Sequence, residues 1–195
     1  MTTIGTRAPG IALTGPVAWQ RTSAVGTELV FPGTAGAGGT AVVTGADPYT
    51  LDWRAGLDDD SAVTEFAASC RGAGWTRTLE MRRTGDGWVT TAEGLGEAGP
   101  PPAELEPSAL ILLAGSPIFL FWAVRHLGLT IESGPVKVTA IRVAVPSLAI
   151  STGPITCHLV SANRLRVTGD GPAGTYELDD SGMVTYQPGQ LRQVR

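Results

Sequence analysis

Lysine is almost absent from this chain. Lys137 is the only lysine among 195 residues, and arginine carries the rest of the positive charge, which leaves a formal net charge of −4. Binding to nucleic acid depends on clustered Lys and Arg side chains that neutralise phosphates, and the sequence has no such cluster. We therefore expect no nucleic acid among the partners.

Cysteine and histidine are also scarce, with two of each. Cys70 and Cys157 lie far apart, and two cysteines in a chain of this size are typical of reduced core thiols rather than of a disulfide framework. Cys157 and His158 are neighbours, but a tetrahedral zinc site needs four ligands, and no second pair of this kind exists. The sequence predicts no metal site and no cofactor.

The motifs of well-known catalytic machinery are missing. There is no G-x-S-x-G, H-E-x-x-H, S-x-x-K or phosphate-loop motif, and so we assign no catalytic residue. Residues 36–41 match the pattern G-x-G-x-x-A of a dinucleotide-binding loop, which must open a helix. The stretch 42–48 that follows is β-branched and broken by Gly and Pro, so we interpret residues 33–40 as a flexible connection.

Long hydrophobic runs are missing as well. The longest one, Leu110 to Val124, is interrupted by Gly115, Ser116 and Pro117, whereas a membrane-spanning helix needs about 20 apolar residues. The N-terminal stretch contains no apolar run suited to a signal peptide. These features predict a cytoplasmic protein without a transmembrane segment, and they do not predict an oligomeric state.

Glycine and proline, by contrast, are abundant, with 26 and 14 copies. So many turn-forming residues without low complexity favour many short strands over long helices. Alternation of apolar and polar side chains predicts about a dozen strands, for example over residues 49–55 and 75–83. The length fits one domain, which we place at residues 16–195, after a loosely ordered N-terminal arm at 1–15, with a Gly/Pro-rich linker at about 92–107.

One segment differs from the strands. Residues 116–127 predict a short helix that is apolar on nearly all sides. Ser116 is a candidate N-cap, Pro117 suits the first helical position, and Gly128 suits the position after the C-cap. A helix without a polar face is buried on several sides. We therefore expect a mainly β fold, in which a curved antiparallel sheet wraps around this helix.

Two cations end the predicted helix. Arg125 and His126 complement the partial negative charge of a helix C-terminus. They are also suited to anchor the polar head of a ligand at the mouth of an apolar cavity, and the sequence leaves both alternatives open. The five tryptophans, in the same way, are candidates either for core packing or for a binding surface.

Several short motifs follow one another in a specific order. The longest is Ser116-Pro-Ile-Phe followed by Val124-Arg-His-Leu-Gly-Leu129, in and after the predicted helix. The others are Trp19 with Gly26-Thr-Glu28, Tyr49 to Trp53, Trp75 to Leu79, Gly85 to Trp88, Val143 to Leu148 and Asp179 to Pro188. Together they cover about residues 17–195 and resemble the pattern of a bacterial family, the putative glycolipid-binding proteins.

This resemblance implies a spiral β-roll, similar in shape to bacterial lipoprotein carriers, and the binding of a glycolipid. The chain departs from the family pattern at three places. Apolar residues stand at 109–113, Phe119-Leu-Phe121 replaces polar residues, and His126 replaces the second of two arginines. If the missing polar groups hold a head group in the family, the ligand of this chain is more apolar or is absent.

The sequence thus predicts a protein that binds a glycolipid or another amphipathic or hydrophobic small molecule in a cavity between the curved sheet and the helix. The residues expected to bind it are Arg125, His126, Trp122, Phe119, Phe121, Glu28 and Trp53. Two alternatives stay open. The chain is a structural or protein-interaction module whose helix is simply core, or it is a cytosolic enzyme that uses Arg125, His126 and a carboxylate such as Glu28.

Overall fold

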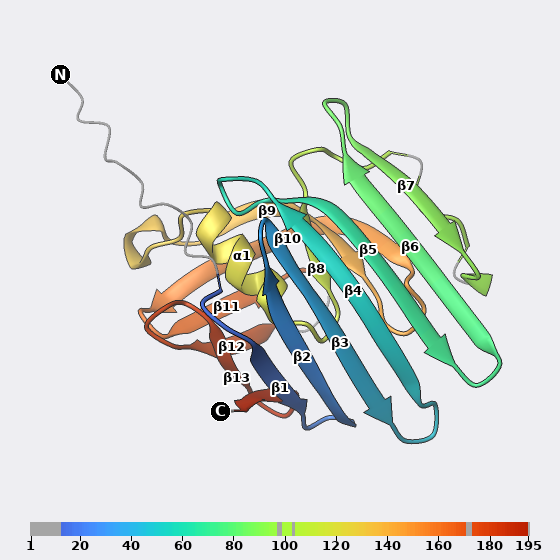
Figure 1. Ribbon diagram of the computed structural model, residues 1–195. Coiled ribbons are helices and arrows are strands. Elements are labelled where there is room, and N and C mark those ends of the chain that lie inside the picture. The colour runs from blue at the N-terminus through green and yellow to red at the C-terminus, as the bar shows by residue number, and fades with distance from the viewer. Residues whose placement is uncertain (1–12, 97–98, 103, 171–172, 195) are drawn as a thin grey trace.

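The computed structural model describes residues 13–96, 99–102, 104–170 and 173–194. Over these residues the chain forms strands joined by short turns, with one α-helix and one short 3-10 helix (Figure 1). The elements are β1 (Val17–Arg21), β2 (Val25–Gly33), β3 (Gly36–Thr44), β4 (Tyr49–Leu57), β5 (Val63–Gly72), β6 (Trp75–Arg83), β7 (Trp88–Glu93), β8 (Leu110–Leu113), α1 (Ile118–His126), η2 (Ile131–Ser133), β9 (Val136–Val143), β10 (Ile150–Ser161), β11 (Arg164–Thr168), β12 (Gly174–Leu178), β13 (Val184–Gln187) and β14 (Leu191–Val194).

All 14 strands belong to one sheet, in the order β7-β6-β5-β4-β3-β2-β1-β14-β13-β12-β11-β10-β9-β8. Neighbouring strands are antiparallel except β8 and β9, which are parallel. The first and last strands pair in the middle of the sheet, where Arg21 of β1 lies opposite Leu191 of β14. Among the described strands, β7 and β8 are the two ends, so the sheet is curved but not closed.

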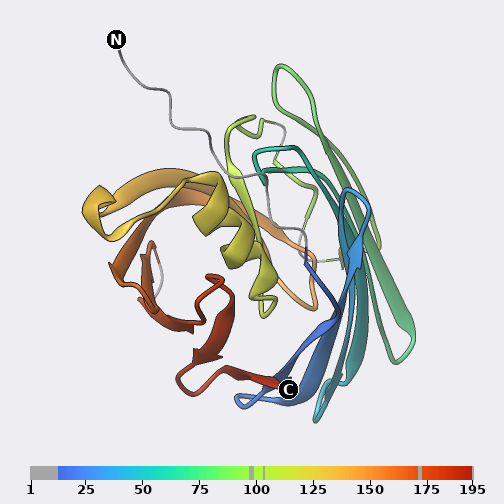
Figure 2. The same cartoon turned by 60° about the vertical axis from the view of Figure 1, so that its left-hand side comes forward.

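The sheet has two halves of different shape. The N-terminal half (β1–β7) is a broad, gently twisted wall, and the C-terminal half (β8–β14) curls around α1 on the opposite side (Figure 2). The helix therefore lies between two walls of one sheet. This arrangement confirms the mainly β fold with a curved sheet around a single apolar helix.

The helix ends where the sequence predicts. The N–H of Leu129 donates to the carbonyl of Val124 at 3.1 Å, and the N–H of Gly128 donates to that of Arg125 at 3.0 Å. With Gly128 at a φ of 56°, these bonds form a Schellman motif, which glycine favours because the left-handed backbone disfavours a Cβ. The predicted N-cap was wrong, since Pro117 takes that position and no side chain caps the helix.

The glycine-rich stretch 33–40 is not a flexible connection. β2 continues to Gly33 and β3 begins at Gly36, so only two residues form the turn. Packing explains why a glycine stands within strand β3, because a Cβ on Gly39 would lie 2.5 Å from the indole of Trp53 on β4. Glycine at this position leaves space for a large aromatic side chain on the inner face of the sheet.

Two further expectations concern the ends and the middle of the chain. The arm expected at 1–15 falls mostly outside the described residues. The linker expected at about 92–107 covers most of the connection from β7 to β8. Within its described part, Leu95 and Leu105 are buried, and the indole N–H of Trp88 donates to the carbonyl of Glu106 at 3.2 Å. This part of the connection packs against the sheet.

Replacing Gly39 tests the close approach of Trp53. We expect Gly39→Ala to lower the free energy of unfolding by about 1–3 kcal/mol, because the added methyl group overlaps the indole. Urea unfolding measures the change. Gly33→Ala is the matched control, since its Cβ would meet its nearest atom at 3.5 Å, an ordinary contact. Equal stability of the native protein and Gly39→Ala would contradict this packing.

Candidate functional site

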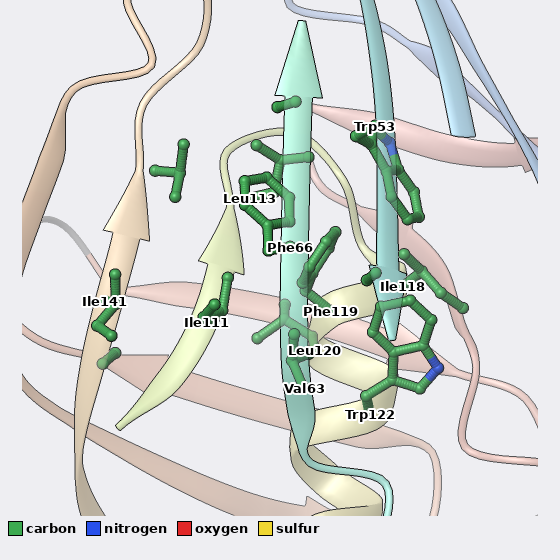
Figure 3. Packing of buried hydrophobic residues seen from close by; sticks show 14 of the residues in the cluster. Trp53, Val63, Phe66, Ile111, Leu113, Ile118, Phe119, Leu120, Trp122 and Ile141 are labelled. Atoms are coloured by element: carbon green, nitrogen blue, oxygen red, sulfur yellow. The ribbon is translucent and has the colours of Figure 1, made fainter. Parts of the chain in front are cut away.

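The face of α1 that meets the N-terminal half is filled by aromatic side chains. The ring centroid of Phe119 lies 5.1 Å from that of Trp53, 5.8 Å from that of Phe66 and 5.0 Å from that of Trp122 (Figure 3). All four rings are buried. The space beside Phe119 and Trp122 amounts to only about 20 Å³. This interface is core, and the rings leave no room for a ligand between them.

A group of polar side chains, the Glu28 cluster, lies beside these rings. It consists of Arg21, Glu28, Tyr49, Trp53 and Ser116. The indole N–H of Trp53 donates to Oε1 of Glu28 at 2.9 Å, and Nη1 of Arg21 donates to the hydroxyl of Tyr49 at 3.0 Å. Glu28 is only 1% exposed, and Ser116 is 4% exposed. The cluster therefore places a carboxyl group and a guanidinium in the interior, next to the start of α1.

Burial raises the pKa of Glu28 above its ordinary value of 4.5, because an ionised carboxylate is poorly solvated in the interior. The hydroxyl of Ser116, the indole of Trp53 and the charge of Arg21 oppose this rise. Even so, Oε2 of Glu28 and Oγ of Ser116 make no hydrogen bond of regular geometry with each other or with another protein atom. The cluster thus has buried hydrogen-bonding capacity that the protein leaves unused.

A much larger recess lies on the opposite side of the helix, toward the C-terminal half. This groove has a volume of about 700 Å³. Its walls come from β8, the start of α1, and the curled strands β9–β14, with further residues from the connection between β13 and β14. Apolar side chains form much of its lining, among them Leu113, Leu120, Ile155, Val167, Tyr176 and Leu191.

Polar side chains occur at separate points of this groove. Ser116 lines it at the start of α1, and Gln187 and Gln190 line it near β14. Arg142 of β9 also lines it, and its Nη2 lies 3.3 Å from a carboxylate oxygen of Asp170. A mostly apolar recess with a few polar groups has the composition of a small-molecule binding site.

A second recess lies at the other end of α1. It has a volume of about 490 Å³ and is lined by Arg125 together with Asp59, Asp60, Asp179 and Asp180. The guanidinium of Arg125 lies over the ring of Phe121, 5.4 Å from its centroid. The Nδ1 atom of His126 lies 3.3 Å from the carbonyl oxygen of Asp60. Arg125 and His126 are therefore engaged at the C-terminal end of the helix.

The residues predicted from the sequence thus fall into two groups. Four of them meet in or beside the aromatic core, namely Glu28, Trp53, Phe119 and Trp122. Phe121, Arg125 and His126 belong to the far end of the helix, as described above. Only Phe119 of the seven also lines the groove. A role in ligand binding for any of the seven stays a prediction.

Sequence reasoning missed Arg21, and it treated Ser116 only as a helix N-cap and not as a residue that lines the groove. Arg21 follows Trp19 by two residues on a strand, so both side chains point to the same, inner face. That spacing could have identified a buried arginine. The groove itself had no local signal, because it is lined by residues from seven strands and the helix that are distant in sequence.

Within the described parts of the chain, no three His, Cys, Asp or Glu side chains gather closely enough to hold a metal ion. The same parts contain no helix that is long and apolar enough to cross a membrane. Both cysteine thiols are free and buried, and burial raises the pKa of each to about 11.

Fold and groove together define a mainly β protein whose open, spirally curled sheet holds one apolar helix. The chain belongs to the family described as putative glycolipid-binding, whose model matches residues 16–193. Its fold is similar to the crystal structure of a DUF1089 family protein from Pseudomonas aeruginosa, with a TM-score of 0.73 and 20% identity over 87% of this chain and 92% of that one. No curated protein is a match.

The buried carboxyl group predicts a specific pH dependence of stability. Because the pKa of Glu28 is raised in the native state, the native protein holds this proton to higher pH than the unfolded chain does. Its free energy of unfolding should therefore fall, relative to that of Glu28→Gln, as pH rises from about 4.5. Urea unfolding of both proteins over a series of pH values measures the difference. A difference that does not change with pH would contradict this assignment.

Proposed function

We propose that this protein binds an amphipathic small molecule, such as a glycolipid, in the groove between α1 and the C-terminal half of the sheet. The observation that carries this proposal is the groove itself. Its volume of about 700 Å³ is in the usual range of about 300–1,000 Å³ for small-molecule sites. The family description, putative glycolipid-binding, agrees with a ligand of this kind.

The lining supports an apolar contact with the ligand. Leu113, Leu120 and Ile155 are each less than 10% exposed, yet they border the groove, so they present apolar surface at its wall. Val167 and Tyr176 on β11 and β12 are half-buried and extend this surface. A hydrocarbon chain that covers these side chains removes apolar area from water, which contributes about 25 cal/mol for each Å².

The aromatic interface between α1 and the N-terminal half holds the helix in place beside the groove. Phe119 packs against Trp53 and Phe66 through one part of its surface and lines the groove with another. The aromatic core thus fixes the position of α1 against the N-terminal half, and the groove wall on the other side does not depend on a ligand for its shape. In this proposal Trp53 and Trp122 hold the helix in place, and Phe119 contacts the ligand.

Blocking the groove tests the proposal. We expect Val167→Trp to weaken the binding of octyl β-glucoside at least about tenfold, because the larger ring occupies the space of the alkyl chain. Val160→Trp is the matched control, since Val160 is 46% exposed and does not border the groove. Isothermal titration measures binding, and circular dichroism checks that both variants are folded.

Two outcomes would overturn the proposal. One is that the native protein does not bind octyl β-glucoside or any other octyl amphiphile. The other is that Val167→Trp binds as tightly as the native protein. Native mass spectrometry of gently purified protein adds a second readout, in which a lipid bound to the native protein should be missing from Val167→Trp.

A further inference from the structure

We infer that the part of the groove at the start of α1 is a head-group subsite that selects a neutral, hydroxyl-bearing head group over an anionic or a cationic one. The subsite consists of Ser116, which lines the groove, with Arg21 and Glu28 behind it. This inference rests on the proposed function, because it assigns one end of the same ligand. It also fixes the orientation of that ligand, with its polar end at Ser116 and its apolar part along β10–β12.

The polar atoms at this place have unused hydrogen-bonding capacity. Nε and Nη2 of Arg21 are buried without a hydrogen-bond partner in the protein. Oγ of Ser116 and Oε2 of Glu28 are also buried and make no hydrogen bond of regular geometry, although Ser116 lies close enough to Glu28 to oppose the rise of its pKa. Buried polar atoms are nearly always paired in native structures, since an unpaired one costs about 1–3 kcal/mol. Four such atoms on three neighbouring side chains indicate a site that a ligand or bound water completes.

These atoms also lie beside the groove. Gly115, Ser116 and Pro117 line the groove immediately before α1. A Cβ on Gly115 would lie 2.6 Å from Nη2 of Arg21, so the guanidinium lies directly against this glycine. Because Gly115 has no side chain, only the backbone separates the guanidinium from the groove. The subsite is therefore next to the recess that holds the apolar part of the ligand.

The opposite charges of Arg21 and Glu28 discriminate between head groups. A phosphate or sulfate would approach the carboxyl group of Glu28, and an ammonium group would approach the guanidinium of Arg21. In the interior, where charges are weakly screened, each of these encounters is unfavourable when the acid is ionised. A hydroxyl group, by contrast, donates to a carboxylate and accepts from a guanidinium at the same time. The pair of opposite charges thus favours a neutral head group with hydroxyls.

Three amphiphiles with the same alkyl chain test this selectivity, namely octyl β-glucoside, octyl sulfate and octyltrimethylammonium, each below its micelle-forming concentration. We expect the native protein to bind the glucoside most tightly in isothermal titrations. Ser116→Ala should weaken glucoside binding about threefold to tenfold, as for the loss of one hydrogen bond. Thr90→Val is the matched control, because the hydroxyl of Thr90 is also buried and unpaired but lies on β7, outside the groove.

A second variant tests the role of the charges. Glu28→Gln keeps the shape of the side chain but removes its charge, so at a pH that ionises Glu28 it should raise the affinity for octyl sulfate relative to the glucoside. Tighter binding of octyl sulfate or octyltrimethylammonium than of the glucoside by the native protein would overturn the inference. So would Ser116→Ala binding the glucoside like the native protein, or Glu28→Gln leaving the sulfate-to-glucoside ratio unchanged. If none of the three amphiphiles binds, the proposed function itself fails.

Discussion

The burial of one helix that is apolar on nearly all sides is the constraint on which the rest of this structure depends. Six consecutive residues of α1, from Ile118 to Ala123, are buried. A flat sheet covers only one side of a helix, so burial on several sides requires a sheet that bends around it. The pairing of β1 with β14 provides this, because it joins the broad N-terminal half and the curled C-terminal half into one sheet on opposite sides of the helix (Figure 2).

The two sides of the helix are nevertheless packed differently. Toward the N-terminal half, large rings on both elements interlock, and Gly39 gives Trp53 the space to do so. Toward the C-terminal half, the curled strands stay at a distance and leave the groove of about 700 Å³. Aromatic side chains bury about 150–250 Å² each, so the filled side alone can hold the helix firmly. The other side can then remain open without loss of the fold.

Local sequence patterns predict the elements of this structure better than its site. The strands β4 and β6 are predicted by their alternation of apolar and polar residues, and the helix by the apolar run at 118–124. These predictions succeed because the face on which a residue is buried determines whether its side chain is apolar. The stretch 33–40 was misinterpreted because clustered glycines locally favour a turn. In the structure, Gly39 lies within a strand, and its lack of a side chain leaves space for Trp53 on the next strand. Ser116 was misinterpreted for a related reason, since N-cap preference is local, but its hydroxyl is buried beside Glu28 of β2 and does not cap the helix.

The two ends of α1 have different electrostatic surroundings. At the C-terminal end, a cation at Arg125 complements the helix dipole, and its guanidinium lies over Phe121 in a recess that acidic side chains also line. At the N-terminal end the partial charge is positive, no side chain caps the helix, and Arg21 adds a further positive charge. The carboxyl group of Glu28 is buried beside Arg21 and Ser116, and burial raises its pKa. The head-group subsite that we infer depends on this buried polar group at the N-terminal end of the helix.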